Sequence, residues 1–298
     1  MDGDIFAHVI LAHVRVSLRF VDVFAEAKFS GNQLCVVADP GDLTGDQMHD
    51  IAREIGFSET TFVTDWSDDR YAMRIFTPDG ELPFAGHPTL GTAFVLVSEQ
   101  RVSSPVTQVV AAGEFLVEVD VEGSFSRMRQ LPPVFEREFE DLELVAAAAG
   151  LSVEDLHPEL PPQVVSTGLG PLLAPVKDVH ALRRAERDAR AVREVVERSG
   201  GEVLYLFAIS GEDVTARMLD PGVGIGEDPA TGSAAGPLGA YLAARGLAGM
   251  PGSIRVAQGE QTGRPSTLHV DVQQDGTSWT VQVGGGVEKV GEGWFDIP

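Results

Sequence analysis

Cysteine is almost absent from this chain of 298 residues: Cys35 is the only one. A single thiol excludes an internal disulfide, a Cys-x-x-Cys metal site and a catalytic pair of thiols. Cys35 lies in an apolar run over 34–37, so we expect a buried side chain rather than a nucleophile. The seven histidines lack ligand spacings such as His-Glu-x-x-His, and the sequence therefore predicts no metal.

Basic residues are also scarce, with 22 Lys and Arg against 45 Asp and Glu and a net charge of −23. A negative field of this size repels phosphate backbones, which argues against nucleic-acid binding. No apolar run has the length of a membrane span, so we expect no membrane partner and a cytoplasmic location. Residues 1–17 have neither signal-peptide nor membrane character, and we interpret them as an extension before strand-like alternation begins near Arg19.

Several common catalytic motifs are missing. The glycines at 222, 224 and 226 lack the Gly-x-Gly-x-x-Gly spacing, and no Gly-x-x-x-x-Gly-Lys-Ser/Thr occurs, so no nucleotide cofactor is predicted. Neither a Gly-x-Ser-x-Gly nor a Cys/His pair with an orienting partner stands out. These absences argue against dinucleotide enzymes and against serine or cysteine hydrolases.

What the chain does contain is many short β-like runs and few helices, in a length that suits two domains. The clearest helical pattern carries Met48, Ile51, Ala52 and Ile55 on one face, with Thr44 as N-cap and Gly56 as its end. A second helix is predicted over 178–198. The strand-like runs are 20–24, 60–64, 71–77, 115–121, 203–209, 267–272 and 279–283.

An internal echo is the most informative pattern. The segment His87-Pro-Thr-Leu-Gly-Thr-Ala93 matches Asp228-Pro-Ala-Thr-Gly-Ser-Ala234, and upstream Arg74-Ile-Phe-Thr-Pro78 matches Arg217-Met-Leu-Asp-Pro221. Two blocks in the same order indicate a duplicated domain. Because proline suits the first turn of a helix, we predict a helix start in each half, with His87 and Asp228 as caps. Two such N-termini facing one cleft would favour an anion.

Each polar residue near these helix starts has two interpretations on sequence alone. Glu59, placed between a helix and a strand, is either a solvated glutamate or a proton-transferring group whose pKa burial would raise. Asp228 is a plain helix cap or a substrate contact, and His87 is a structural histidine or a proton donor. Ser233 either packs or binds a ligand.

A series of short motifs covers nearly the whole chain after Arg19. They are Phe20-Val-Asp-Val-Phe24, Gly31-Asn32, Ser58-Glu-Thr-Thr-Phe62, Phe76-Thr-Pro78, Glu81-Leu-Pro-Phe-Ala-Gly-His-Pro-Thr89, Ser166-Thr-Gly168, Asp228-Pro-Ala-Thr-Gly-Ser-Ala234, Gln258-Gly259, Gly263-Arg-Pro-Ser266 and Gly284-Gly285. With these motifs the chain resembles the phenazine-biosynthesis isomerase (PhzF-like) family, whose fold is related to that of diaminopimelate epimerase. Gln33 departs from the proline that this family commonly has after Gly-Asn.

The resemblance implies an α+β fold of two pseudo-symmetric β-barrel-like domains, each wrapped around a central helix, and a homodimer. Pro132-Pro133 is the predicted linker, so residues 1–131 form the N-terminal domain and 132–286 the C-terminal domain. The last strand, 287–298, is expected to return to the N-terminal domain.

The resemblance also implies an isomerase without cofactors that acts on a small carboxylic acid, with trans-2,3-dihydro-3-hydroxyanthranilate as one candidate. The proton-shuttling glutamate falls on Glu59. The substrate-positioning residues fall on His87, Asp228 and Ser233, with Gly86, Thr231 and Gly232 beside them. Two alternatives stay open: an amino-acid epimerase or racemase with bases other than cysteine, and a non-catalytic protein that binds small acids.

Overall fold

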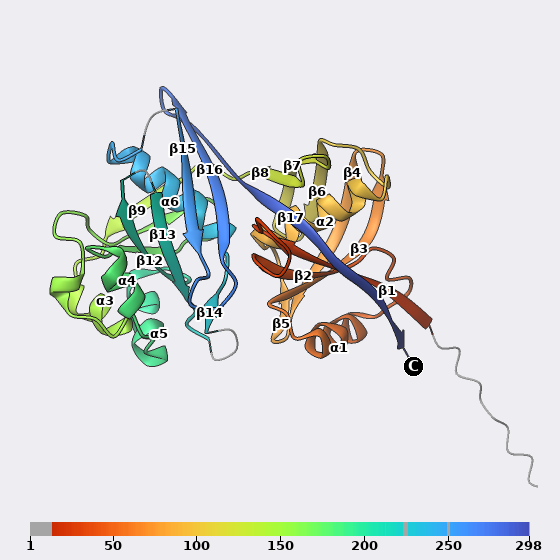
Figure 1. The fold of residues 1–298 in the computed structure, drawn as a ribbon, viewed down its shortest axis with the longest axis horizontal. Helices are drawn as coiled ribbons and strands as arrows, with labels where there is room; N and C mark the ends of the chain where they lie inside the picture. Colours follow the sequence, from red (N-terminus) through yellow and green to blue (C-terminus); the bar gives the residue numbers. More distant parts are fainter. Residues whose placement is uncertain (1–13, 212, 223–225, 249–250, 298) are drawn as a thin grey trace, which may run out of the picture.

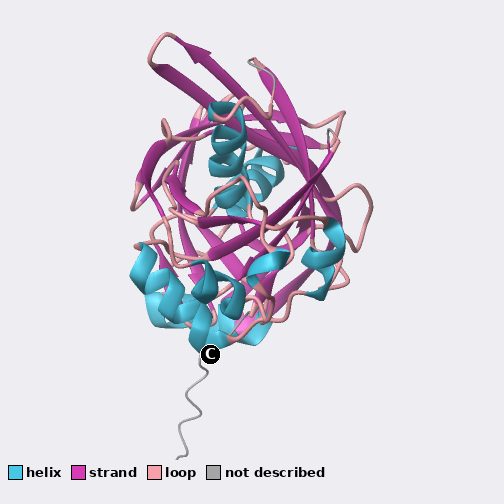
Figure 2. Cartoon of the chain, turned by 90° about the vertical axis from the view of Figure 1, so that its left-hand side faces the viewer, coloured by secondary structure: helices cyan, strands magenta, loops and turns pink. Residues whose placement is uncertain are grey.

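The computed structural model describes residues 14–211, 213–222, 226–248 and 251–297, which form two barrel-like halves connected by one long strand (Figure 1). Strands surround a central helix in each half, as the view in Figure 2 shows. These helices are α2 (Gly86–Ser98) and α6 (Gly232–Ala244), and both are apolar on nearly all sides. The predicted fold class is therefore confirmed. No helix in the described part of the chain is both long and apolar enough to span a membrane.

The first half contains most strands that surround α2. Gly91 lets α2 approach them, because a Cβ there would lie 2.6 Å from Leu34 Cδ2. Its elements are β1 (Val14–Val23), β2 (Asn32–Val37), α1 (Gly45–Ile55), β3 (Glu59–Ser67), β4 (Arg70–Thr77), β5 (Gly80–Leu82), α2, β6 (Val106–Val110), β7 (Gly113–Asp120) and β8 (Phe125–Arg129). β1 begins at Val14, so the prediction that residues 1–17 are an extension is wrong for 14–17, and residues 1–13 lie outside the described part.

The second half surrounds α6 and carries the remaining short helices. Its elements are β9 (Val134–Glu138), α3 (Leu142–Ala148), η1 (Val153–Asp155), β10 (Gln163–Ser166), β11 (Leu172–Pro175), α4 (Val179–Arg184), α5 (Ala189–Ser199), β12 (Leu204–Ser210), β13 (Asp213–Leu219), β14 (Glu227–Asp228), α6, β15 (Gly252–Gln258) and β16 (Ser266–Asp275). The single helix predicted over 178–198 is wrong. α4 ends at Arg184, and a separate helix, α5, begins at Ala189. Asp188 is the N-cap of α5, because its carboxylate accepts hydrogen bonds from the amides of Arg190 and Ala191.

One long strand, β17 (Ser278–Ile297), connects the halves. It pairs with β16 as far as Gly284, with β8 through Gly286, and with β1 from Val287 onward (Figure 1). A Cβ at Gly286 would lie 2.1 Å from Ala25 O, so the crossing point has no room for a side chain. The predicted domain boundary at 286 coincides with the point where β17 changes partner from β8 to β1. The division at 131 and 286 stays a prediction.

The first short helix, α1, matches its prediction from the sequence. Thr44 is its N-cap in a capping box with Gln47, and Gly56 ends it with φ 69°. Met48, Ile51 and Ala52 of the predicted face are buried, and Ile55 is half-buried. Local signals alone set this element.

Replacing Thr44 by Ala should lower the free energy of unfolding by about 1 kcal/mol, because the N-cap hydroxyl no longer accepts the Gln47 amide hydrogen. Chemical denaturation measures the difference. Thr44→Ser keeps the hydroxyl and serves as the matched control. Equal losses in both variants would contradict the capping role.

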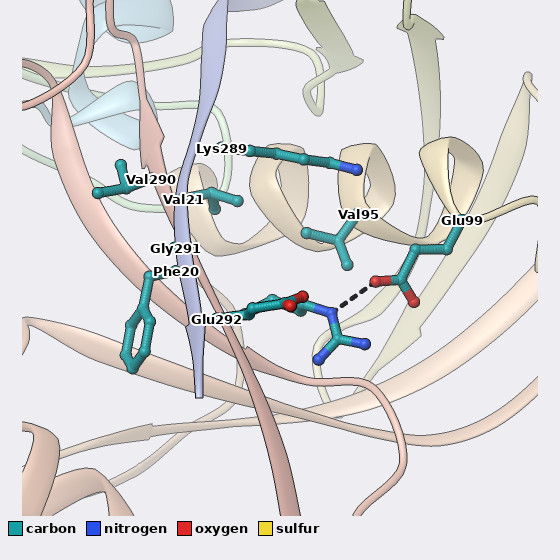
Figure 3. Close-up of a pocket in the computed structure, with 9 residues that line it drawn as sticks. Phe20, Val21, Val95, Glu99, Lys289, Val290, Gly291 and Glu292 are labelled. Carbon is teal, nitrogen blue, oxygen red and sulfur yellow. Dashed lines mark hydrogen bonds and ion pairs between the residues drawn. The ribbon is translucent and has the colours of Figure 1, made fainter. Parts of the chain in front are cut away.

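A cavity of about 260 Å³ lies between β1, β17 and the C-terminal part of α2 (Figure 3). Its wall includes the ion pair between Arg19 and Glu99, with Nε and Oε1 2.7 Å apart, and the Lys289 ammonium. None of the residues predicted for the site lines it. This cavity is therefore separate from the predicted site.

Candidate active site

A larger cavity, of about 680 Å³, lies where the two halves meet. Both halves contribute to its wall, and all seven residues predicted for the site are among its lining. The described lining includes four carboxylates and no Lys or Arg. The wall is formed by Asn32, Gln33, Gly56, Phe57, Ser58, Glu59, Thr77, Pro78, Asp79, Leu82, Phe84, Ala85, Gly86, His87, Leu169, Val203, Met218, Asp220, Asp228, Pro229, Ala230, Thr231, Gly232 and Ser233.

Glu59 is the first residue of β3, paired in register with Leu34 of the parallel strand β2. Its side chain is 14% exposed, and its Oε2 lies 3.5 Å from His87 Nε2. Oε2 accepts no hydrogen bond from the described residues. Burial raises the pKa of Glu59 to about 7, against a smaller opposite effect of the Ser58 hydroxyl. The carboxyl is thus buried, as the catalytic interpretation requires.

Asp228 reaches the same cavity from β14 of the other half and is 8% exposed. Its Oδ1 accepts a hydrogen bond from Asn32 Nδ2 at 2.7 Å, and its Oδ2 accepts one from the Thr231 hydroxyl at 2.6 Å. Burial, and then the negative charge of Glu59, raise the pKa of Asp228 to about 7. Two like charges in one buried site compete for a proton.

His87 lies between these carboxylates and is 4% exposed. Burial lowers the pKa of His87 to about 4, although the charge of Asp228 and the backbone of Gln33 act in the opposite direction. The imidazole is therefore neutral near pH 7. It can hold a substrate by a hydrogen bond without adding a charge.

Both central helices begin at this cavity, but not where the echo predicted. α2 begins at Gly86 after Ala85, and α6 begins at Gly232 after Thr231, so neither His87 nor Asp228 is a cap. Pro88 lies inside the first turn and Pro229 lies before its helix. Asp228 ends a short strand paired with β13 instead, since Met218 is its partner there.

The two helix starts touch each other. A Cβ at Gly86 would lie 3.1 Å from the backbone nitrogen of Ser233, so a larger residue would push the two helix starts slightly apart. Ser233 is 9% exposed and lines the cavity. Two adjoining N-termini supply free N–H groups and partial positive charge, which suits a carboxylate where no cationic side chain is present.

Three further residues, given no role by sequence reasoning, connect the site. Asn32 Oδ1 accepts a hydrogen bond from Ser58 Oγ at 3.1 Å, while its Nδ2 contacts Asp228. Gln258 Nε2 donates to Asp228 O at 2.8 Å and to Thr231 Oγ1 at 3.0 Å. All three lie in segments that carry the family resemblance, but their partners are distant in sequence, so no local pattern indicated their function.

A metal site does not form in the described part of the chain, where no three His, Cys, Asp or Glu side chains gather in a suitable cluster. Cys35 is fully buried, and burial raises the pKa of its thiol to about 12. Cys35 is therefore a core residue.

Comparison with known proteins identifies the family of this chain. The family model described as phenazine biosynthesis-like protein matches residues 21–293. The chain belongs to the phenazine biosynthesis-like family. A curated member, the trans-2,3-dihydro-3-hydroxyanthranilate isomerase of Pseudomonas aeruginosa, is 34% identical over 92% of this chain and 96% of its own length. The predicted family and enzyme class, an isomerase, are confirmed.

Solved structures of this family and its relatives share the fold. A predicted epimerase from Pseudomonas aeruginosa is 36% identical, with a TM-score of 0.84 over 95% of this chain and 99% of its own. A probable proline racemase from Agrobacterium radiobacter has a TM-score of 0.65 over 95% and 93% of the two chains at 15% identity. The second likeness concerns the fold alone.

Proposed function

We propose that this phenazine biosynthesis-like protein moves a proton within a small cyclic or unsaturated carboxylic acid, with Glu59 as general base and then general acid. The observation that carries the proposal is the unpartnered Oε2 of Glu59, buried in the cavity beside a neutral His87. A carboxyl with a pKa near 7 can both accept and return a proton at neutral pH. The candidate substrate is trans-2,3-dihydro-3-hydroxyanthranilate, the compound named for the Pseudomonas relative.

The wall of the cavity suits such a molecule. Leu82, Phe84 and Met218 offer apolar surface to a ring, while the adjoining starts of α2 and α6 offer N–H groups to its carboxylate. Asp228, as an anion, can accept a hydrogen bond from an amino group. His87 and Ser233 would fix the orientation of the substrate by further hydrogen bonds.

The alternative of an epimerase needs two bases on opposite faces of the substrate. Asp228 is the other buried carboxylate, but Asn32 and Thr231 already donate to both of its oxygens. Glu59 is left as the group with a free oxygen. This arrangement favours transfer by one residue on one face.

Incubation with trans-2,3-dihydro-3-hydroxyanthranilate in deuterated water, followed by proton NMR, tests the proposal. We expect a shifted double bond, with deuterium partly excluded because one carboxyl carries the proton. Inversion at a stereocentre of an amino acid, with full deuterium incorporation, would instead favour the epimerase. Tight binding of this and related small acids with no chemical change over hours would contradict catalysis and favour a binding protein.

The pH dependence of kcat/KM follows from the raised pKa. Glu59 must be ionised to remove the first proton, so kcat/KM should fall as pH drops below about 7, near the pKa of Glu59. His87 should add no transition between pH 5 and 8, because its pKa is lowered to about 4. Initial rates measured across this range give the profile. A flat profile would contradict the assignment of Glu59 as base.

A further inference from the structure

The amide of Asn32 contacts Asp228 and Ser58, the residue before Glu59, and has only one possible orientation. Its Nδ2 is 2.7 Å from Asp228 Oδ1 and 3.1 Å from Ala230 O, and a backbone carbonyl can only accept. Its Oδ1 takes the hydrogen of the Ser58 hydroxyl at 3.1 Å. Asn32 is 1% exposed, so water does not compete for these contacts.

The backbone at Asn32 is also fixed, by segments of the second half. Gly31, directly before it, has φ 71° and donates its N–H to Pro265 O at 2.9 Å. The Arg264 guanidinium donates to Gly31 O at 2.9 Å and pairs with the buried Asp22. Such a support holds a side chain in place for a site that spans both halves.

Asp228 receives its second donor through an equally defined network. Gln258 Oε1 accepts from the Tyr205 hydroxyl at 2.8 Å and from Thr231 N at 3.2 Å, which directs Gln258 Nε2 toward Thr231 Oγ1. The hydroxyl hydrogen of Thr231 must then point to Asp228 Oδ2. Both oxygens of Asp228 therefore face donors, and an anion is the form these donors stabilise.

Glu59 has fewer donors. Its Oε2 has none among the described residues, and the one hydrogen of Ser58, whose hydroxyl has only a smaller lowering effect on the pKa of Glu59, has Asn32 Oδ1 as its acceptor. Similar burial affects both carboxyls, so the hydrogen bonds decide which of them keeps a shared proton. The other titratable groups near them are His87, Tyr205 behind Gln258, and the lining carboxylates Asp79 and Asp220.

We propose that Asn32 is a positioning residue that keeps Asp228 ionised and thereby assigns the mobile proton of the carboxylate pair to Glu59. The role of this proton in the reaction rests on the proposed function. The charge distribution itself is a property of the protein without substrate. Asn32 cannot titrate. It acts by stabilising one charge distribution of the pair.

Carbon-13 NMR of the side-chain carboxyls tests the inference without any substrate. Protein labelled at Asp Cγ and Glu Cδ is titrated between pH 4.5 and 9, and Asp228→Asn and Glu59→Gln assign the two resonances. In the unsubstituted protein we expect Glu59 to have the higher midpoint. A higher midpoint for Asp228 would overturn the proposal, whether or not any substrate is ever turned over.

Asn32→Ala then supplies the causal test. Loss of its donor should raise the midpoint of Asp228 by about one to two pH units. The midpoint of Glu59 should fall, because its neighbour is then neutral, and the acid limb of kcat/KM should move to lower pH with it. Gln108→Ala, which removes a buried amide of β6 away from the cavity lining, is the matched control and should move neither midpoint.

Unmoved midpoints in Asn32→Ala would overturn the proposal even if activity falls, because a purely structural role would act that way. If Asn32→Ala does not fold, Thr231→Val removes the other donor of Asp228 and should raise the same midpoint. A proton-assigning network requires that shift, and its absence would also overturn the inference.

Discussion

Replacing Glu59 by Gln should lower kcat by about 10²- to 10⁴-fold, the range in which a positioned general acid or base contributes. The amide has nearly the same shape as the carboxylic acid but can neither take nor return a proton. Because the lining is otherwise unchanged, substrate affinity measured by calorimetry should stay within a few-fold. Steady-state rates of the isomerisation check the loss.

The same substitution should lower activity but raise the free energy of unfolding at high pH, relative to the unsubstituted protein. The folded protein raises the pKa of Glu59 from 4.5 to about 7, so folding favours the protonated carboxyl. The free energy of unfolding of the unsubstituted protein therefore falls as pH rises from 4.5 to 7 on account of this group, and Gln lacks that loss. Relative to the unsubstituted protein, Glu59→Gln should be more stable at pH 8 than at pH 5.

Glu54→Gln is the matched control for both measurements, since Glu54 is exposed on α1. It should alter neither kcat nor the pH dependence of stability. A Glu59→Gln variant with full activity would refute the role of Glu59. An inactive variant that has also lost its fold would not meet the stability prediction and would count against a purely chemical role.

Sequence reasoning succeeded where the determining forces are local or repeated. Thr44 and Gly56 were predicted as the N-cap and the end of α1, and the structure confirms both. The echo correctly indicated two similar halves. A helix of small and apolar residues on all sides must be buried, and in each half the strands surround it. Burial of Cys35 followed from its apolar neighbours.

The helix starts were misplaced because proline has more than one use. Pro229 fits the first turn of a helix, but the residues around it form β14 and then a loop whose carbonyl at Ala230 binds Asn32. Long-range contacts decide between these conformations. The roles of Asn32 and Gln258 also depend on long-range contacts and were not predicted. Asn32 and Asp228, for example, are 196 residues apart in the sequence. No local pattern contains that information.

The echo also pairs Arg74 with Arg217, and the structure gives these two residues unequal surroundings. Arg217 has a side chain that is 7% exposed, pairs with Glu227 at 2.7 Å, and donates to the backbone oxygens of Leu182 and Ala185. Arg74 makes the corresponding contact with Glu81 at 2.7 Å, but the side chains are 37% and 44% exposed. The same chemistry is therefore present in a buried and in an exposed form.

Arg217→Met should lower the free energy of unfolding by about 3–5 kcal/mol, because the partly buried Glu227 and two carbonyls would lose their donor. Arg74→Met, the matched control, should cost about 1 kcal/mol or less, since water can solvate Glu81. Urea denaturation of the three proteins measures both values. Glu227 directly precedes Asp228 on β14, so the damaged variant should also lose activity at temperatures where it is still folded. Equal losses of stability in both variants would mean that burial does not determine how much the Arg217–Glu227 and Arg74–Glu81 ion pairs stabilise the fold.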